Sequence, residues 1–147
     1  MDRAALEWAL ANGIAHGGWC PKGRKAEDGI IPPQFHLKET ASENHLVRTR
    51  RNVRDSGGTV IFSRNPELNG GTQETAAFAK EIGKPFLHLV TSMDVPLAAQ
   101  ELKTFLREHE ISVLNVAGPR ESEEPGLSKF VRSVLSTALR KIAATLP

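Results

Sequence analysis

The fold is decided by residues 56–90, which read SGGTVIFSRNPELNGGTQETAAFAKEIGKPFLHLV. The apolar runs at 59–62 and 86–90 have the unbroken hydrophobic character of strands that are buried on both faces. Between them, a turn-rich loop at 64–71 leads into a helix expected over 72–82. A strand, a helix and a second strand in this order predict one unit of a parallel sheet.

The rest of the chain continues this alternation. Helices are expected over residues 2–12, 42–55, 94–110 and 127–142, with Ser42 and Asp94 as N-caps, and strands over 14–19 and 112–116. The segment 20–40 is punctuated by proline and glycine and is predicted to be irregular. We therefore expect an α/β fold, a Rossmann-like doubly wound parallel sheet of about four strands in three layers, forming one domain over residues 1–147.

The composition, 39% hydrophobic and 24% charged over 147 residues, is that of a soluble globular protein. Cys20 is the only cysteine, which excludes a disulfide within the chain. No apolar run reaches the ~18 residues that cross a bilayer, and the N-terminus lacks the basic-then-apolar order of a secretory signal. We expect a cytoplasmic protein with no membrane partner.

Charge is unevenly distributed along the chain. Residues 20–54 hold eight basic and four acidic residues, a net charge of +4, and the remainder, with 11 basic and 13 acidic residues, is −2. A local positive field favours an anionic partner, although a solvated basic face is an open alternative. Tyrosine is absent and aromatic residues make up 5%, so base-stacking platforms for nucleic acid are lacking. The expected partner is a small anionic ligand and not a nucleic acid.

The loop that opens the helix at 72 is a candidate anion site. Gly70 and Gly71 allow close approach of the backbone to a ligand, and Thr72 adds a hydroxyl at a helix N-terminus, where the dipole favours an oxyanion. The alternative is a simple turn with a capping threonine. The pattern is neither GxGxxG nor GxxxxGK[ST].

A second polar group is expected to join this loop in one pocket. Lys22 and Arg24 lie on a Gly/Pro-bounded loop at a strand end, and Arg48 and Asn52 share a helical face with Thr49 near its edge. Each of these residues alone is typical of an ordinary surface, which remains the alternative.

The cysteine and the histidines are the remaining candidates for reactive or metal-binding groups. The basic residues beside Cys20 could lower its pKa and make a thiolate for a soft metal; the alternative is a small half-buried residue under Trp19. His16, His36, His45, His88 and His109 lack metal-ligand spacing, so no metal site is expected. We interpret His88, in a buried strand, as a hydrogen-bonded core residue.

Several runs of sequence resemble one family: HGGWCPKGRKAEDGIIP (16–32), LKET (37–40), RTRRNVRDSGGTVIF (48–62), LNGGTQET (68–75) and IGKPFL (82–87). They are similar to the "putative molybdenum carrier" family of small bacterial Rossmann-like proteins, which is related to the SLOG and Lonely Guy-type nucleotide-ligand proteins. The resemblance implies a homo-oligomer, a dimer or tetramer, that binds a small phosphorylated ligand. That ligand is a pterin such as the molybdenum cofactor (molybdopterin) or a nucleotide-like molecule.

The same resemblance leaves two functions open. Lonely Guy-type phosphoribohydrolases use a GGxGTxxE loop, which binds phosphate and supplies a catalytic glutamate. Gly70, Gly71 and Thr72 match it loosely, and Glu74 follows Thr72 by two residues where that motif has three. The main expectation is therefore a carrier without a catalytic residue. The alternative is a nucleotide N-glycosidase or phosphoribohydrolase with Glu74 as acid/base.

The resemblance also predicts that a central first strand is missing. Relatives begin with a strand and a loop of the type SGGQTGxDRAAL, whereas this chain starts at the equivalent of its last residues, MDRAAL. We expect a vacant central position between strands 14–19 and 59–62, and fewer backbone donors for a ligand. A misassigned start and a truncated relative are both open readings.

Overall fold

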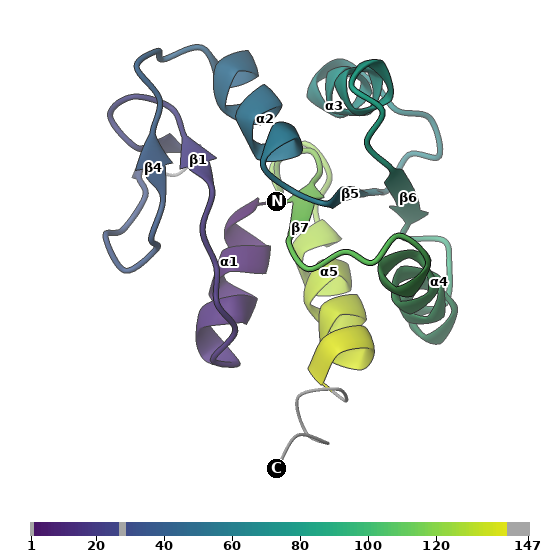
Figure 1. Cartoon of the computed structure of the whole chain (residues 1–147). Helices are drawn as coiled ribbons and strands as arrows, with labels where there is room; N and C mark the ends of the chain where they lie inside the picture. Colours follow the sequence, from purple (N-terminus) through teal and green to yellow (C-terminus); the bar gives the residue numbers. More distant parts are fainter. Residues whose placement is uncertain (1, 27–28, 141–147) are drawn as a thin grey trace.

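The computed structural model describes residues 2–26 and 29–140, and it shows helices around short parallel strands (Figure 1). The elements are α1 (Asp2–Ala11), β1 (Trp19–Cys20), β2 (Lys25–Ala26), β3 (Gly29–Ile30), β4 (Lys38–Glu39), α2 (His45–Arg54), β5 (Gly58–Ser63), α3 (Gly70–Glu81), β6 (Phe86–Val90), α4 (Val95–Glu108), β7 (Leu114–Ala117), α5 (Leu127–Leu135) and a π-helical turn, η1 (Ser136–Arg140). None of the helices within this described part combines the length and the apolar character needed to span a membrane.

Strands β5, β6 and β7 form a three-stranded parallel sheet in the order β6-β5-β7. Thr59 on the central strand is in register with Phe86 on one side and Asn115 on the other. All six residues of β5 are buried, as a central strand covered on both faces requires. The parallel sheet with helices on both faces confirms the predicted fold class.

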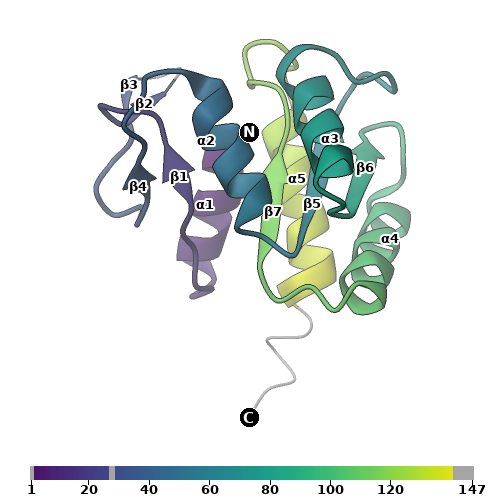
Figure 2. The same ribbon diagram turned by 45° about the horizontal axis from the view of Figure 1, so that its top comes forward.

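Successive side chains of β5 point to opposite helical layers. Val60 and Phe62 join a core built with apolar residues of α1, α4 and α5. Ile61, which lies between them and is also fully buried, points to the other face, where α2 packs against α3. Figure 2 shows α2 and α3 in front of the strands and α5 behind them. The sheet is thus the middle of three layers.

The predicted strand over 14–19 is mostly wrong. Only Trp19 and Cys20 are extended in a strand, and they pair in parallel with Lys38 and Glu39 in a separate two-stranded sheet. The other edge of Trp19 is taken by the amide of Asn52, which accepts from the Trp19 N–H at 2.8 Å and donates to its carbonyl oxygen at 3.2 Å. A side chain thus ends this small sheet.

The predicted vacancy beside strand 59–62 is also wrong, because β6 and β7 occupy both edges of β5. The main sheet consequently has three strands where about four were expected. Among residues 2–26 and 29–140, no strand pairs with the second edge of β7, and α1 packs beside that strand.

The segment 20–40 is ordered by one arginine. The Arg24 guanidinium donates four hydrogen bonds of 2.9–3.2 Å to the carbonyl oxygens of Ile31, Pro32, Phe35 and Leu37. The chain between these carbonyls therefore curls around a single cation, and β2 and β3 form a short antiparallel hairpin. The segment also has an apolar cluster of its own, made by Cys20, Ile31 and Phe35.

Several predicted helix and strand ends shift. Asn44, not Ser42, caps α2, because its Oδ1 accepts from the Leu46 N–H at 2.9 Å. Asp94 is the N-cap residue of α4 as predicted, although its side chain makes no capping hydrogen bond. α3 begins two residues before the predicted start, α4 ends at 108 and the last strand is 114–117. The last α-helix ends at 135 and continues as η1; the final predicted position, Ile142, lies outside the described residues.

Candidate functional site

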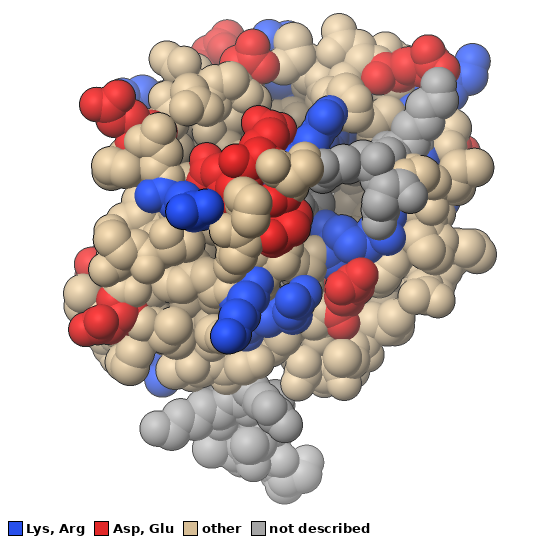
Figure 3. Space-filling view, turned by 180° about the vertical axis from the view of Figure 1, so that it is seen from behind, with Lys and Arg blue, Asp and Glu red and all other residues tan. Residues whose placement is uncertain are grey.

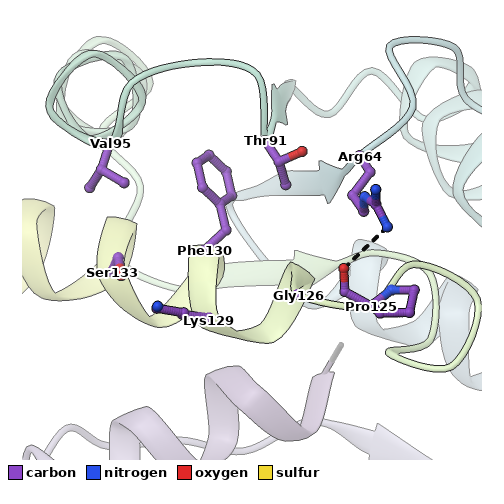
Figure 4. Close-up of a pocket in the computed structure, with 8 residues that line it drawn as sticks. All are labelled: Arg64, Thr91, Val95, Pro125, Gly126, Lys129, Phe130 and Ser133. Carbon is purple, nitrogen blue, oxygen red and sulfur yellow. Dashed lines mark hydrogen bonds between the residues drawn. The ribbon is translucent and has the colours of Figure 1, made fainter.

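A pocket of about 420 Å³ lies at the carboxyl edge of the three-stranded sheet. This is the edge at which open parallel sheets bind ligands, because the loops after the strands meet there. The pocket lies between the start of α4 and the first turns of α5 (Figure 4). Its lining residues are Arg64, Thr91, Val95, Pro125, Gly126, Lys129, Phe130 and Ser133.

The lining combines positive charge with an apolar wall. Arg64 and Lys129 are both exposed and supply the two cations. The ring of Phe130 points into the space between Val95 and Thr91 (Figure 4) and packs edge-on against Phe62 with a centroid distance of 6.1 Å. An apolar surface with a few polar groups at its rim suits an organic anion.

Arg64 connects the pocket to the loop that leads into α3. Its backbone N–H donates to the carboxylate of Glu124, and its Nη1 donates to the carbonyl oxygen of Pro125 at 3.3 Å. Figure 4 shows the Arg64 side chain directed toward Pro125. Residues 118–126, the β7–α5 segment, are therefore held against the end of the central strand.

Glu121 anchors the other end of the β7–α5 segment. Its carboxylate accepts from the N–H of Ser128 at 2.9 Å and of Gly126 at 2.6 Å. These two backbone hydrogen bonds, together with one from the Ser128 side chain, hold the pKa of Glu121 below its usual range. A carboxylate of the protein thus caps the N-terminus of α5, so the N–H groups of Gly126 and Ser128 already have an acceptor.

Ser63, which is buried, and His88, which is half-buried, form a hydrogen-bonded pair at the same edge. The Ser63 hydroxyl donates to the Asn65 carbonyl oxygen at 2.6 Å and lies 2.5 Å from His88 Nε2. Because the hydroxyl has one proton and a carbonyl only accepts, His88 Nε2 must carry the proton of the second bond. The pair therefore supports the loop after β5 and is not arranged as a nucleophile and its base. Burial lowers the pKa of His88, and the nearby Glu124 charge opposes this shift. The prediction of a hydrogen-bonded His88 is confirmed.

The predicted glycine loop forms an open helix start. α3 begins at Gly70, which has a φ of +50°, and a Cβ added at Gly70 or Gly71 would meet no atom within 4 Å. Thr72 is buried, and its hydroxyl donates to the Asn69 carbonyl oxygen at 2.7 Å. The loop leaves room for an oxyanion beside the two glycines, while the hydroxyl proton of Thr72 is used within the protein.

None of the predicted ligand residues lines the pocket, and this includes Gly70, Gly71 and Thr72. The side chains of Asn52 and Arg24 form hydrogen bonds with backbone groups of the protein, and Lys22 is exposed on the surface. Arg48 and Thr49 are half-buried on α2. Their role in binding a ligand stays a prediction.

The start of α2 nevertheless approaches the β7–α5 segment. Burial is the main cause that lowers the pKa of His45, and the charges of Arg48 and Arg120 lower it further. Arg48 also lies near Cys20, but burial outweighs its influence and raises the pKa of the Cys20 thiol. Cys20 is buried, at 2% exposure, and its pKa is not lowered as the thiolate reading requires, so the structure favours the alternative of a small packed residue.

On the face that Figure 3 shows, the charges do not form one continuous basic field. Seen from behind, acidic side chains gather near the middle of the surface with basic ones around them (Figure 3).

Glu74, the alternative catalytic residue, is exposed on α3 and does not line the pocket. In the part of the chain that the structure describes, no group of three or more His, Cys, Asp or Glu side chains could hold a metal ion.

Sequence reasoning missed Arg64 and Lys129. Arg64 had a usable signal, since it is the first residue after a buried strand whose following loop was expected at the binding edge. No signal in the sequence singles out Lys129, because a lysine on an amphipathic helix is ordinarily a solvated side chain.

The layered parallel sheet, with a pocket at the carboxyl ends of its strands, defines a protein of the Rossmann-like class. Within that class, the chain belongs to the circularly permutated YpsA SLOG family, whose model matches residues 1–139.

The chain is also similar to a protein of known structure. The 1.45 Å crystal structure of a protein described as "putative molybdenum carrier protein", from Syntrophus aciditrophicus SB, is similar with a TM-score of 0.91 and 39% sequence identity. The similarity covers 94% of this chain and 87% of that one. None of the curated proteins matches this chain. The family resemblance seen in the sequence is confirmed.

Proposed function

We propose that this protein binds a small phosphorylated ligand at the carboxyl edge of its sheet and carries it without changing it chemically. The observation that supports this best is the pocket, where Arg64 and Lys129 stand beside the apolar wall of Phe130 and Val95. The cations attract the phosphate, and the wall accepts the organic part of the ligand. Arg64 also begins the loop that leads to the open glycines, which offer a second place for an oxyanion.

We propose the molybdenum cofactor, a phosphorylated pterin, as the ligand. This finer assignment is supported by the description of the similar crystal structure as a molybdenum carrier protein. A flat ring with a phosphate has the two properties that the pocket combines. No observation on Glu74 favours the nucleotide-hydrolase alternative.

Native mass spectrometry of freshly purified protein tests both parts of this proposal. We expect a retained mass that matches a phosphorylated pterin, and the same spectrum counts the subunits of the expected dimer or tetramer. A protein that never retains or binds a phosphorylated molecule contradicts the proposal.

Calorimetric titration with adenosine 5′-monophosphate as a probe tests the site. Arg64→Gln and Lys129→Gln should each weaken binding about fivefold to tenfold, which corresponds to roughly 1–1.4 kcal/mol. Arg107→Gln, at the far end of α4, removes the same charge outside the pocket and should leave the affinity within about twofold. Equal affinity in all three variants would place the site elsewhere, and release of adenine would point to hydrolysis.

A further inference from the structure

The carboxylate of Glu124 occupies a backbone donor at the binding edge. It accepts from the N–H of Arg64, the first residue after the central strand. The side chain is half-buried, and its charge is close enough to act on His88, which lies on the neighbouring strand. A fixed negative charge therefore already stands at the carboxyl ends of β5 and β6.

An incoming oxyanion needs the same groups that Glu124 uses. Backbone N–H groups and arginine side chains are the ordinary donors to phosphate, and charge-assisted bonds to them are the strong ones. Arg64 offers both kinds of donor from one position. A phosphate that bound there beside the Glu124 carboxylate would meet a like charge, which opposes binding.

From this juxtaposition we infer that Glu124 is an internal competitor of the anionic ligand. Its carboxylate holds the Arg64 N–H in the absence of ligand, and the oxyanion displaces it on binding. This inference rests on the proposed function, and it makes Glu124 a determinant of the affinity of the site.

The contacts of the β7–α5 segment allow the Glu124 side chain to leave the Arg64 N–H while the rest of the segment stays in place. Glu121 fixes the segment to α5 through the N–H groups of Gly126 and Ser128. The contacts to Arg64 come from Glu124 and from the carbonyl oxygen of Pro125. Displacement of one carboxylate therefore requires no unwinding of the helix that follows.

The adjacent Glu123 provides a matched control. It is 62% exposed, and its carboxylate lies 3.9 Å from Nε of Arg120. Glu123→Gln and Glu124→Gln remove the same charge one residue apart. Glutamine keeps an acceptor oxygen, so Glu124→Gln can retain the bond to Arg64 and with it the local fold, while the competing charge is lost. Glu124→Ala is a second variant that removes the acceptor as well.

The test is a titration of ¹⁵N-labelled protein with inorganic phosphate at constant ionic strength, followed through the amide resonance of Arg64. We expect phosphate to shift this resonance in the wild type. The affinity should rise at least fivefold in Glu124→Gln and in Glu124→Ala, and stay within twofold in Glu123→Gln.

Two results separate this inference from the proposed function. If phosphate binds the wild type but equally or more weakly after Glu124→Gln, or leaves the Arg64 resonance unmoved, the inference is overturned and the proposed function stands. If neither the wild type nor any variant binds phosphate, both are overturned. Binding by the Glu124 variants alone supports the inference.

Discussion

At the scale of single residues, the basic side chains near Trp19 are engaged within the protein. The Arg51 guanidinium lies 4.7 Å and the Lys38 ammonium 5.5 Å from the centre of the Trp19 ring. The indole N–H donates to Asp55 at 2.8 Å, and Arg54 donates to both oxygens of the same carboxylate. Cation–π contacts and ion pairs thus use part of the charge that the sequence shows between 20 and 54. Counting charges overstates the field that remains for a ligand.

Asp55 should titrate with a pKa of about 2, because hydrogen bonds from Arg54 and then from Trp19 stabilise its carboxylate. The folded pKa is below the unfolded value of about 3.9, so the stabilisation is complete above that value. It is lost as the pH falls through about 2. Both partners are roughly half exposed, at 56% and 45%, so the effect on stability is small.

The Trp19 indole N–H resonance reports this titration directly. Its chemical shift should change with a midpoint near pH 2 in the wild type, and the step should vanish in Asp55→Asn. A midpoint near 4 would mean that the two hydrogen bonds do not persist in solution.

Arg24 and Asn52 show why the candidate site was only partly predictable. Both positions require a polar side chain, and the sequence pattern indicates this polar character. The sequence does not indicate the hydrogen-bond partner of either side chain. Arg24 donates to four backbone carbonyl oxygens, and Asn52 accepts from the backbone N–H of a residue 33 positions away. A polar residue in a loop satisfies either a ligand or the chain itself, and only the folded contacts distinguish the two.

At the scale of elements, the segments with clear periodicity were predictable and the short ones were not. β5, β6 and the helices from α2 onward follow apolar patterns that local sequence displays. β1 has two residues, and its edges are set by the distant Lys38, Glu39 and Asn52. Local patterning carries no information on such long-range pairing, so the predicted strand was too long and was placed in the wrong sheet.

The start of α3 offers a matched pair of glycines. Gly70 has a φ of +50°, which an L side chain adopts at a cost, whereas Gly71 does not have a positive φ. Gly70→Ala should lower the free energy of unfolding by about 1–2 kcal/mol. Gly71→Ala should raise it by about 0.4–1 kcal/mol, because alanine favours the helix and restricts the unfolded chain. Neither added methyl group meets a neighbouring atom within 4 Å, so backbone conformation alone is tested.

Urea denaturation of the two variants measures these changes. Opposite signs are expected; a loss of the same size in both would mean that the turn at Gly70 does not differ from that at Gly71.

At the scale of the whole molecule, the first and the last helices of the described chain pack into the same hydrophobic core. Ala4 and Trp8 of α1 belong to the same apolar cluster as Val134 and Ala138 near the C-terminal end, with Phe62 of the central strand. α1 packs along α5 in the structure (Figure 1). α1 and α5 thus lie on the same face of the sheet, an arrangement that no local sequence pattern specifies.

One hydrogen bond across this closure can be tested. Trp8 is 5% exposed, and its indole N–H donates to the Ser136 hydroxyl at 2.7 Å. Ser136→Ala leaves that donor buried without an acceptor and should lower the free energy of unfolding by about 1–3 kcal/mol. Thr137→Ala is the control: the neighbouring hydroxyl is exposed and donates within its own helix to Ser133, so a change within about 0.5 kcal/mol is expected.

A double-mutant cycle isolates the bond from the loss of volume. Trp8→Phe removes the donor together with part of the ring, and its own effect combines the bond with a cavity. In the Trp8→Phe background, Ser136→Ala should cost little, because no buried donor is left behind, which gives a coupling energy of about 1–3 kcal/mol. Urea unfolding of the four proteins measures it. Additive changes, or a Ser136→Ala effect no larger than that of Thr137→Ala, would show that the ends of the chain are joined by apolar packing alone.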